Sequence, residues 1–325
     1  MLASVLRAAT ALVLALGAAG VQAQAYPNKP ITLVVPFAAG ASADGIARVV
    51  GRELSQVLGQ PVVVDNKPGA GGALGLMAVA KSAADGYTIG LGATGAIVIN
   101  PHLPDAPPLK PQQDLLPLAK LADIPLVFVT SASSGYGNLQ AFINAARKTP
   151  GGLSYATAGQ YTAQHLSGGL LASMTGAKLV AVPYRGSGPA VTDVLGGSVP
   201  AAMVDLTSAY PHVKAGKLVA LGVTSASRSK VAPEIPTIAE EGVQGYAAPA
   251  WMGLFLPAKT PADVRSALSA ALRKVMATAA VQGQIQGLAA EPAYMDAAAF
   301  GQFITGESGK WAAVLARLPA PAKKN

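Results

Sequence analysis

Small and polar residues gather directly after the first apolar segment of the chain. Residues 31–35 form a short, β-branched apolar run, which indicates a buried strand. Gly40, Ser42 and Asp44 follow it, at the start of a segment whose apolar residues recur at helical spacing. We expect Ser42 to cap this helix and Asp44 to lie in its first turn, where a carboxylate suits the helix dipole. Free N–H groups at such a helix start can bind an anion, although an ordinary strand–helix turn has the same pattern.

A second glycine-rich pattern has the spacing of a dinucleotide site. Gly90 to Gly95 reads G-x-G-x-x-G and follows a predicted strand. Such a site needs a long helix directly afterwards and an acidic residue further on. Asn100-Pro101 stops the chain too soon for that helix, so we reject a dinucleotide-binding function.

Nucleophilic catalysis is a further possibility for the first loop. The sequence around Ser42 approaches the nucleophile elbow G-x-S-x-G, except that Asp44 replaces the last glycine. A hydrolase that pairs Ser42 with His165 or His212 therefore stays open as an alternative. His102, His165 and His212 are too far apart in sequence to indicate a metal site.

Composition narrows the range of partners. The 325 residues include 24 Lys and Arg against 16 Asp and Glu, a formal net charge of +8, and no cysteine. This length is sufficient for two domains with an ample core. The basic residues are scattered and are not interleaved with aromatic residues, which argues against a nucleic-acid partner. A mildly basic protein attracts small anions, and the lack of cysteine excludes disulfides and thiolate metal sites.

The N-terminus has the plan of a secretory signal peptide. Arg7 precedes an apolar run over residues 8–21, and small residues at two-residue spacing follow it. We therefore expect a signal peptide at residues 1–24, cleaved near Ala23 or Ala25, and a periplasmic mature chain, with a retained anchor as the alternative.

Strand-like and helix-like segments alternate through the remaining sequence. The expected strands are residues 31–35, 61–65, 87–91, 126–130, 153–157, 179–183, 200–204, 218–224 and 251–256. The expected helices are residues 46–58, 73–82, 138–148, 162–174, 187–195, 207–214 and 261–277, with a last one from about 296. Residues 101–117 are rich in proline and predict an irregular segment. This alternation indicates an α/β fold with mostly parallel sheets flanked by helices.

Many short motifs, in order along the chain, resemble one family of transport receptors. They are Pro36-Phe37-x-x-Gly40-x-Ser42-x-Asp44, Asn66-Lys67-Pro68-Gly69-Ala70-Gly71-Gly72, Asp85-Gly86-Tyr87-Thr88, Asn100-Pro101, Ser154-Tyr155-Ala156, His165-Leu166, Val182 to Ala190, Leu195-Gly196-Gly197, Lys214 to Lys217, Val223-Thr224-Ser225, Ile235 to Glu240 and Trp251 to Pro257. The pattern is similar to that of the extracytoplasmic solute receptors of tripartite tricarboxylate transporters, the Bug-type binding proteins. Each motif alone is weak, but together they cover nearly the whole mature chain.

The resemblance implies a two-lobed periplasmic-binding-protein fold, type II-like, with the ligand in a cleft between the lobes. One lobe would combine residues 25–125 and 250–325, and the other would comprise residues 126–249. The segments Leu126–Thr130 and Trp251–Leu256 are the expected crossovers, so we place the hinges there.

The resemblance also implies a ligand and the residues that bind it. Receptors of this family typically bind small organic carboxylates through backbone N–H groups, hydroxyls and water, which agrees with an anion site at a helix start. The residues carried over by motif position are Phe37, Ala39, Gly40, Ala41, Ser42 and Asp44 from one lobe, and Ala158, Gly159, Gln160, Tyr161, Thr162, His165, Arg185 and Asp205 from the other.

The implied partners are the membrane subunits of a transporter, with no cofactor, no metal and no catalysis. Nothing in the sequence indicates more than a monomer. An exported serine hydrolase and a receptor that signals to a membrane sensor are the alternative functions.

Two residues depart from the family pattern. Ala41 and Tyr161 stand where these receptors usually have glycine. Alanine adopts fewer backbone conformations than glycine at such a position. We hypothesise that Tyr161 narrows the pocket or stacks on a flat ligand, with a surface aromatic side chain as the alternative.

Overall fold

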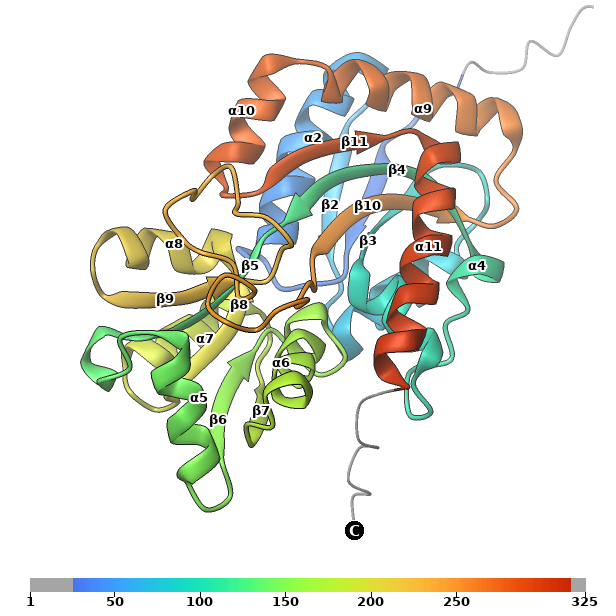
Figure 1. The fold of residues 1–325 in the computed structure, drawn as a ribbon. Coiled ribbons are helices and arrows are strands. Elements are labelled where there is room, and N and C mark those ends of the chain that lie inside the picture. The colour runs from blue at the N-terminus through green and yellow to red at the C-terminus, as the bar shows by residue number, and fades with distance from the viewer. Residues whose placement is uncertain (1–25, 317–325) are drawn as a thin grey trace, which may run out of the picture.

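The computed structural model describes residues 26–316, which form two β-sheets with helices packed around each (Figure 1). The predicted signal peptide lies outside the described residues. No helix in the described part of the chain combines the length and the apolar character needed to cross a membrane.

The first lobe is built on a six-stranded sheet with the order β11-β4-β10-β3-β1-β2. Its strands are β1 (Ile31–Val35), β2 (Val62–Asn66), β3 (Thr88–Ala93), β4 (Leu115–Ile124), β10 (Ala250–Pro257) and β11 (Glu291–Met295). Strand β1 lies parallel to β2 and β3, whereas β10 lies antiparallel to β3 and β4. All residues of β10 are buried, which explains its continuous apolar sequence.

The second lobe is built on a five-stranded sheet with the order β7-β6-β8-β5-β9. Its strands are β5 (Leu126–Ser131), β6 (Leu153–Thr157), β7 (Leu179–Pro183), β8 (Ala201–Asp205) and β9 (Leu218–Val223). Strand β6 is parallel to β7 and β8, and β5 is antiparallel to β8 and β9.

Helices from both halves of the sequence cover the first sheet, and helices from the middle of the sequence cover the second (Figure 1). In the first lobe they are α2 (Ser42–Leu58), α3 (Ala73–Ala80), α4 (Pro111–Asp114), α9 (Ala262–Met276), α10 (Ala279–Gly287) and α11 (Ala297–Leu315), with short helical turns at Ala70–Gly72, Gly95–Ile99 and Asn100–His102. In the second lobe they are α5 (Leu139–Lys148), α6 (Ala163–Thr175), α7 (Ser187–Leu195) and α8 (Leu206–Lys214), with a turn at Ala132–Ser134.

The chain passes between the lobes at two places. Pro125 separates β4 from β5, and residues 224–249 connect β9 to β10. The longer connection packs on the second lobe, where Ile238 N–H donates to Val223 O and Ala248 N–H donates to Thr224 O. The turning points therefore lie at Pro125 and just before Ala250.

The two-lobed α/β architecture expected from the sequence is confirmed, but each sheet is mixed and not mostly parallel. The strands next to the crossing points, β5 and β10, run antiparallel to both of their neighbours.

The sequence analysis was wrong to leave residues 101–117 wholly irregular, because β4 begins at Leu115 and includes Pro117. The β10–β4 register shifts between Leu254 and Phe255, and Phe255 pairs with Pro117, so an irregular pairing accommodates the proline. Strand β11 and helix α10 were not predicted either.

Candidate ligand-binding site

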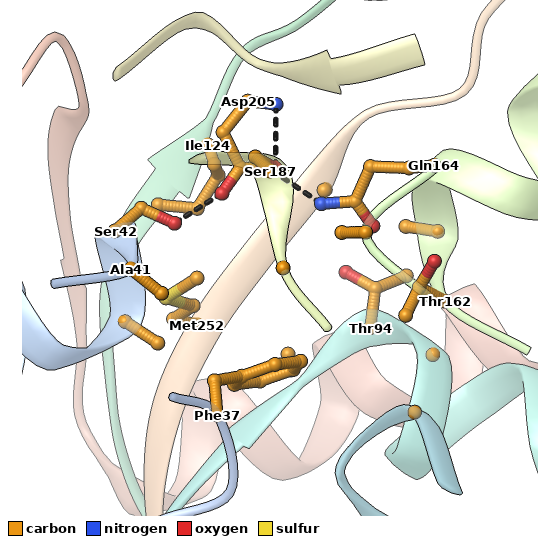
Figure 2. Close-up of a pocket in the computed structure, with 18 of the residues that line it drawn as sticks. Phe37, Ala41, Ser42, Thr94, Ile124, Thr162, Gln164, Ser187, Asp205 and Met252 are labelled. Carbon is orange, nitrogen blue, oxygen red and sulfur yellow. Dashed lines mark hydrogen bonds between the residues drawn. The ribbon is translucent and has the colours of Figure 1, made fainter. Parts of the chain in front are cut away.

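A cavity of about 30 Å³ lies between the lobes (Figure 2). The first lobe contributes Phe37, Ala41, Ser42, Ala43, Gly71, Ala93, Thr94, Gly95, Ile124, Ala250, Trp251 and Met252. The second lobe contributes Ala158, Thr162, Ala163, Gln164, Gly186, Ser187 and Asp205. Since a single water needs roughly 10–15 Å³ of such space, the lobes enclose room for about two waters in this arrangement.

Several helix N-termini converge on this cavity. Helix α2 begins at Ser42, α7 begins at Ser187, and α6 and α8 have Thr162 and Asp205 as their N-caps. All four residues line the cavity. Helix starts carry unpaired N–H groups and a partial positive charge, so their convergence favours an anion. None of the lining residues is a lysine, arginine or histidine, so the positive potential comes from the backbone.

Asp205 is the acidic side chain of the cavity and links the two lobes. The Ser42 hydroxyl of the first lobe donates a hydrogen bond to the Asp205 carboxyl group, and the Gln164 side-chain amide of the second lobe donates another (Figure 2). Asp205 N–H donates to Ser187 Oγ at 3.2 Å. Burial raises the pKa of Asp205, although the hydrogen bonds from Ser42 and Gln164 partly oppose this shift.

Ser42 does not cap its helix, which corrects the expectation from the sequence. The N-cap position belongs to Ala41, and Ser42 is the first residue of α2. Its hydroxyl instead crosses the cavity to Asp205.

Asp44 supports the loop from behind and does not line the cavity. It accepts hydrogen bonds from Gly40 N–H at 3.0 Å, Arg48 Nε at 2.9 Å and Asn66 Nδ2 at 3.0 Å. Burial alone would raise the pKa of Asp44, but these hydrogen bonds outweigh it, so the pKa lies below its usual value. The predicted ligand residue is therefore a brace that fixes the loop ahead of α2.

Other predicted ligand residues of the first loop divide between the cavity and the surface. Phe37 and Ala41 line the cavity. Ala39 and Gly40 are exposed and lie outside it. Gly40 has a φ of +81°, a conformation that suits glycine at the tip of this turn.

The second predicted loop also contributes only part of its residues. Ala158 and Thr162 line the cavity, whereas Gly159 does not. Arg185 is exposed outside it, and the two residues that follow Arg185, Gly186 and Ser187, take its place.

Gln160, Tyr161 and His165 lie on a different hollow, which we call the outer groove. It has a volume of about 1070 Å³ and runs between α6 of the second lobe and the end of α11 of the first. Its lining residues are His102, Leu103, Pro104, Gln160, Tyr161, His165, Leu166, Gly169, Ala172, Ser173, Gly176, Ala177, Lys178, Leu179, Ala312, Leu315 and Ala316. Tyr161 thus lines the outer groove and not the cavity between the helix starts.

Several cavity residues were missed by the sequence analysis. Thr94 and Gly95 end the glycine pattern that was tested only as a dinucleotide site. Ser187 opens α7 directly after a strand and a glycine, which is the same strand–loop–helix signal that identified Ser42. Gln164 and Trp251 had no signal of their own, because their positions depend on how the lobes face each other.

Proteins of known family resemble this chain over most of its length. The sequence pattern of the tripartite tricarboxylate transporter family receptors matches residues 46–319. Protein BugT of Bordetella pertussis is 37% identical over 307 residues, which are 94% of each chain. The periplasmic binding protein BugD superimposes with a TM-score of 0.84 at 31% identity, over 90% of this chain and 98% of BugD. An R. palustris protein solved with adipate gives a TM-score of 0.85 at 30% identity, over 90% and 98% of the two chains.

The similarity includes both lobes, since each of these structures covers 90% of the chain. The family match begins within α2 and extends past α11. It therefore contains almost every element that surrounds the cavity. On these grounds the chain belongs to the tripartite tricarboxylate transporter family of receptors and is a periplasmic solute-binding protein of the Bug type.

Proposed function

We propose that this protein captures a small organic carboxylate between its lobes and delivers it to the membrane subunits of a tripartite tricarboxylate-type transporter. The observation that carries the proposal is the convergence of the α2, α6, α7 and α8 N-termini on one enclosed cavity. A carboxylate there would accept hydrogen bonds from helix-start N–H groups and from hydroxyls. The similar R. palustris protein was solved with adipate, which supports this ligand class.

Asp205 defines the electrostatic condition for such a ligand. Two ionised carboxylates side by side repel each other strongly, so one of them must hold a proton. Burial favours the protonated form of Asp205. A neutral Asp205 would donate a hydrogen bond to the bound carboxylate. The donor would be the carboxyl group that accepts from Ser42 and Gln164 in this structure.

The alternative of a serine hydrolase required Ser42 next to His165 or His212. His212 lies on α8 and does not line the cavity with Ser42. In the structure Ser42 donates to Asp205, and His165 Nδ1 accepts the N–H of Tyr161. His165 lines the outer groove and Ser42 lines the cavity. These contacts support binding over nucleophilic catalysis at Ser42.

Thermal unfolding of the chain from residue 26 onward tests the ligand class. The panel would contain adipate and other mono-, di- and tricarboxylates, each with its matched amide. A ligand at 100 times its dissociation constant adds about 2.7 kcal/mol to the free energy of unfolding, enough to raise Tm by several degrees. We expect at least one acid to raise Tm while its amide does not, because only the acid carries the charge.

Variants connect the result to the cavity. Ser42→Ala should weaken binding of that acid about fivefold through the loss of one hydrogen bond worth about 1 kcal/mol. Ser266→Ala is the matched control, since Ser266 is an exposed α9 residue that bonds only within its own helix. Equal shifts by acids and amides would contradict a carboxylate receptor. So would the lack of any shift in a chain that releases no small molecule on denaturation.

A further inference from the structure

His165 makes a hydrogen bond at the start of α6 that the binding site itself does not explain. Thr162, the N-cap, accepts the N–H of His165 at 3.3 Å. In return, His165 Nδ1 accepts the N–H of Tyr161 at 3.1 Å. This reciprocal pair resembles a capping box in which histidine replaces the usual Glu or Gln. The ring therefore fixes the peptide that enters the helix.

The backbone of Tyr161 also contacts the first lobe. With its amide oriented to satisfy its neighbours, Asn100 of the first lobe donates to Tyr161 O at 3.1 Å and to Gly95 O at 3.2 Å. A Cβ atom on Gly95 would lie 2.6 Å from Tyr161 O, so the two backbones are in direct contact. One on Gly71 would lie 2.8 Å from Gln160 O. The first lobe thus packs directly on the turn at Tyr161, to which His165 is hydrogen-bonded.

This turn has an unfavourable backbone conformation. Tyr161 has a φ of +64°, which costs a residue with a side chain about 1–2 kcal/mol. Interactions around the turn must therefore maintain it. The backbone N–H of Tyr161 donates to His165, and the backbone carbonyl of Tyr161 accepts from Asn100. Thr162, the next residue, lines the cavity (Figure 2).

We propose that His165 is a positioning residue for ligand capture, which holds the Tyr161 turn in the shape that docks on Asn100 and so permits the lobes to close. It acts through Tyr161 and does not touch the ligand. The inference rests on the proposed function, because lobe closure matters only if a ligand is enclosed.

The contact requires a neutral ring. Nδ1 accepts the hydrogen bond from the Tyr161 N–H only while it keeps its lone pair, and in a protonated histidine both ring nitrogens are donors. Protonation of Nδ1 would place its N–H opposite the Tyr161 N–H, so the hydrogen bond would be lost and the turn would no longer be held. Burial lowers the pKa of His165 from its ordinary value of 6.5, which agrees with a ring that stays neutral in the closed form.

The ionisable groups on the surrounding elements do not take part in the hydrogen bond between Tyr161 N–H and His165 Nδ1. They are Tyr155 on β6, Lys178 ahead of β7, Asp205 at the end of β8, and His102 from the first lobe. Tyr155 donates to the backbone carbonyl of His165, and Asp205 bonds to Gln164 on the cavity side. Within residues 26–316, the bond from Tyr161 N–H is the hydrogen bond that the His165 ring makes.

The sign of the pH effect follows from linkage. If closure keeps His165 neutral while the open form takes up a proton with the ordinary pKa of 6.5, closure is unimpaired above that pH and weakens as the pH falls below it. For one proton, the His165-dependent part of the affinity should be about tenfold weaker at pH 5.5 than at pH 7.5, measured relative to a variant that differs only at His165.

Titration calorimetry with the acid that gives the largest thermal shift tests this, at pH 7.5 and 5.5. His165→Asn keeps an acceptor close to the Nδ1 position but does not titrate in this range. It should bind as tightly as the unmodified chain at pH 7.5 and show no His165-linked loss at pH 5.5. His165→Leu removes the acceptor and should bind about fivefold more weakly at pH 7.5. His212→Asn, on α8 and outside both hollows, is the control and should titrate like the unmodified chain.

Lobe closure can be measured independently of affinity. The chain has no cysteine, so a single engineered pair at Leu74 on α3 and Val180 on β7, which are 52% and 51% exposed, accepts two spin labels. We expect saturating acid to shorten the distance between the labels at pH 7.5 in the unmodified chain and in His165→Asn, and to shorten it less in His165→Leu.

The outcomes separate the two proposals. If no acid binds to the unmodified chain, the proposed function fails, and the role of His165 in ligand capture, which rests on it, fails with it. If acids bind but His165→Leu binds and closes like the unmodified chain, or His165→Asn keeps the full pH dependence, the role of His165 is wrong while the proposed function stands.

Discussion

At the scale of single residues, the cavity has no basic side chain among its lining residues. The hydroxyl groups and helix-start N–H groups around the cavity supply the positive potential, and Asp205 lies among them as an acid that is only 4% exposed. A buried carboxyl group favours its neutral form, so this residue is suited to face an anion.

Asp205→Asn should change how stability depends on pH. Because burial raises the pKa of Asp205 above its ordinary 3.8, its contribution to stability is fully present below pH 3.8 and is lost as the pH rises through the raised pKa. The amide variant lacks this loss, so its Tm relative to the unmodified chain should increase from pH 4 to 7. Each kcal/mol corresponds to about 2–4 °C. Thermal unfolding at four pH values measures the difference.

Asp263→Asn provides the matched control for this comparison. Asp263 also lies at a helix start, but it is exposed in the first turn of α9. Its Tm difference from the unmodified chain supplies the reference curve with which the Asp205→Asn difference is compared. Parallel curves for Asp205→Asn would show that its carboxyl group titrates normally in the folded protein.

At the scale of elements, glycines allow the turn before α6 to lie against the first lobe. Gly95 opens the helical turn after β3, and Gly71 belongs to the turn ahead of α3. Both meet the backbone of residues 160–162 too closely for a side chain. These contacts connect elements of different lobes, so they affect closure more than the folding of either lobe.

Gly95→Ala should block closure while leaving both lobes folded. The new methyl group would lie 2.6 Å from Tyr161 O and 3.0 Å from Thr162 Cα, which are backbone atoms of the other lobe. We expect the affinity for the acid to fall more than tenfold, which corresponds to about 1.4 kcal/mol. The Tm without ligand should change little. Calorimetry and thermal unfolding measure the two effects.

Gly309→Ala is the control for the added methyl group. Gly309 is exposed on α11, and a Cβ atom there meets nothing within 4 Å. It should keep the affinity and gain some stability, because alanine is the better helix former by about 1 kcal/mol. Normal affinity in Gly95→Ala would mean that the lobes bind ligand without this contact.

At the scale of the whole molecule, the two lobes are joined at Pro125 and through residues 224–249. The cavity lies where helix starts from both lobes meet, and the sheets themselves stay apart (Figure 1). This arrangement suits rotation of rigid lobes about the connections. A ligand that contacts both lobes shifts the population towards the closed form.

Hydrogen exchange should therefore show protection in both lobes at once. Saturating acid is expected to slow exchange at residues 42–45 of the first lobe and at residues 162–165 and 187–190 of the second, because these amides lie at the helix starts around the cavity. Exchange in the buried strands β5 and β10 should change least, since it is already slow. Mass spectrometry of peptic fragments measures this. Protection limited to α6 and α11 would instead place the ligand in the outer groove.

Much of the site was predictable because helix starts have local signals. The loop before α2 was located from small residues between an apolar run and a helical pattern, and its Ser42 lines the cavity. Asp205, Tyr161, His165 and Arg185 were carried over from the family resemblance, and of these only Asp205 lines the cavity. Their sequence positions are right for the loops, but the direction of a side chain from a loop depends on its backbone turn.

The sequence by itself determined the alternation of strands and helices and the small-residue loops at the helix starts. These features arise from apolar periodicity and backbone chemistry within a few residues. Only the tertiary structure decided that Ser42 meets Asp205, 163 residues away, that Asp44 braces its own loop, and that Tyr161 turns outward while its carbonyl contacts Asn100. The physical reason is that contacts across the lobes depend on how two separately folded sheets face each other, and no local pattern records that orientation.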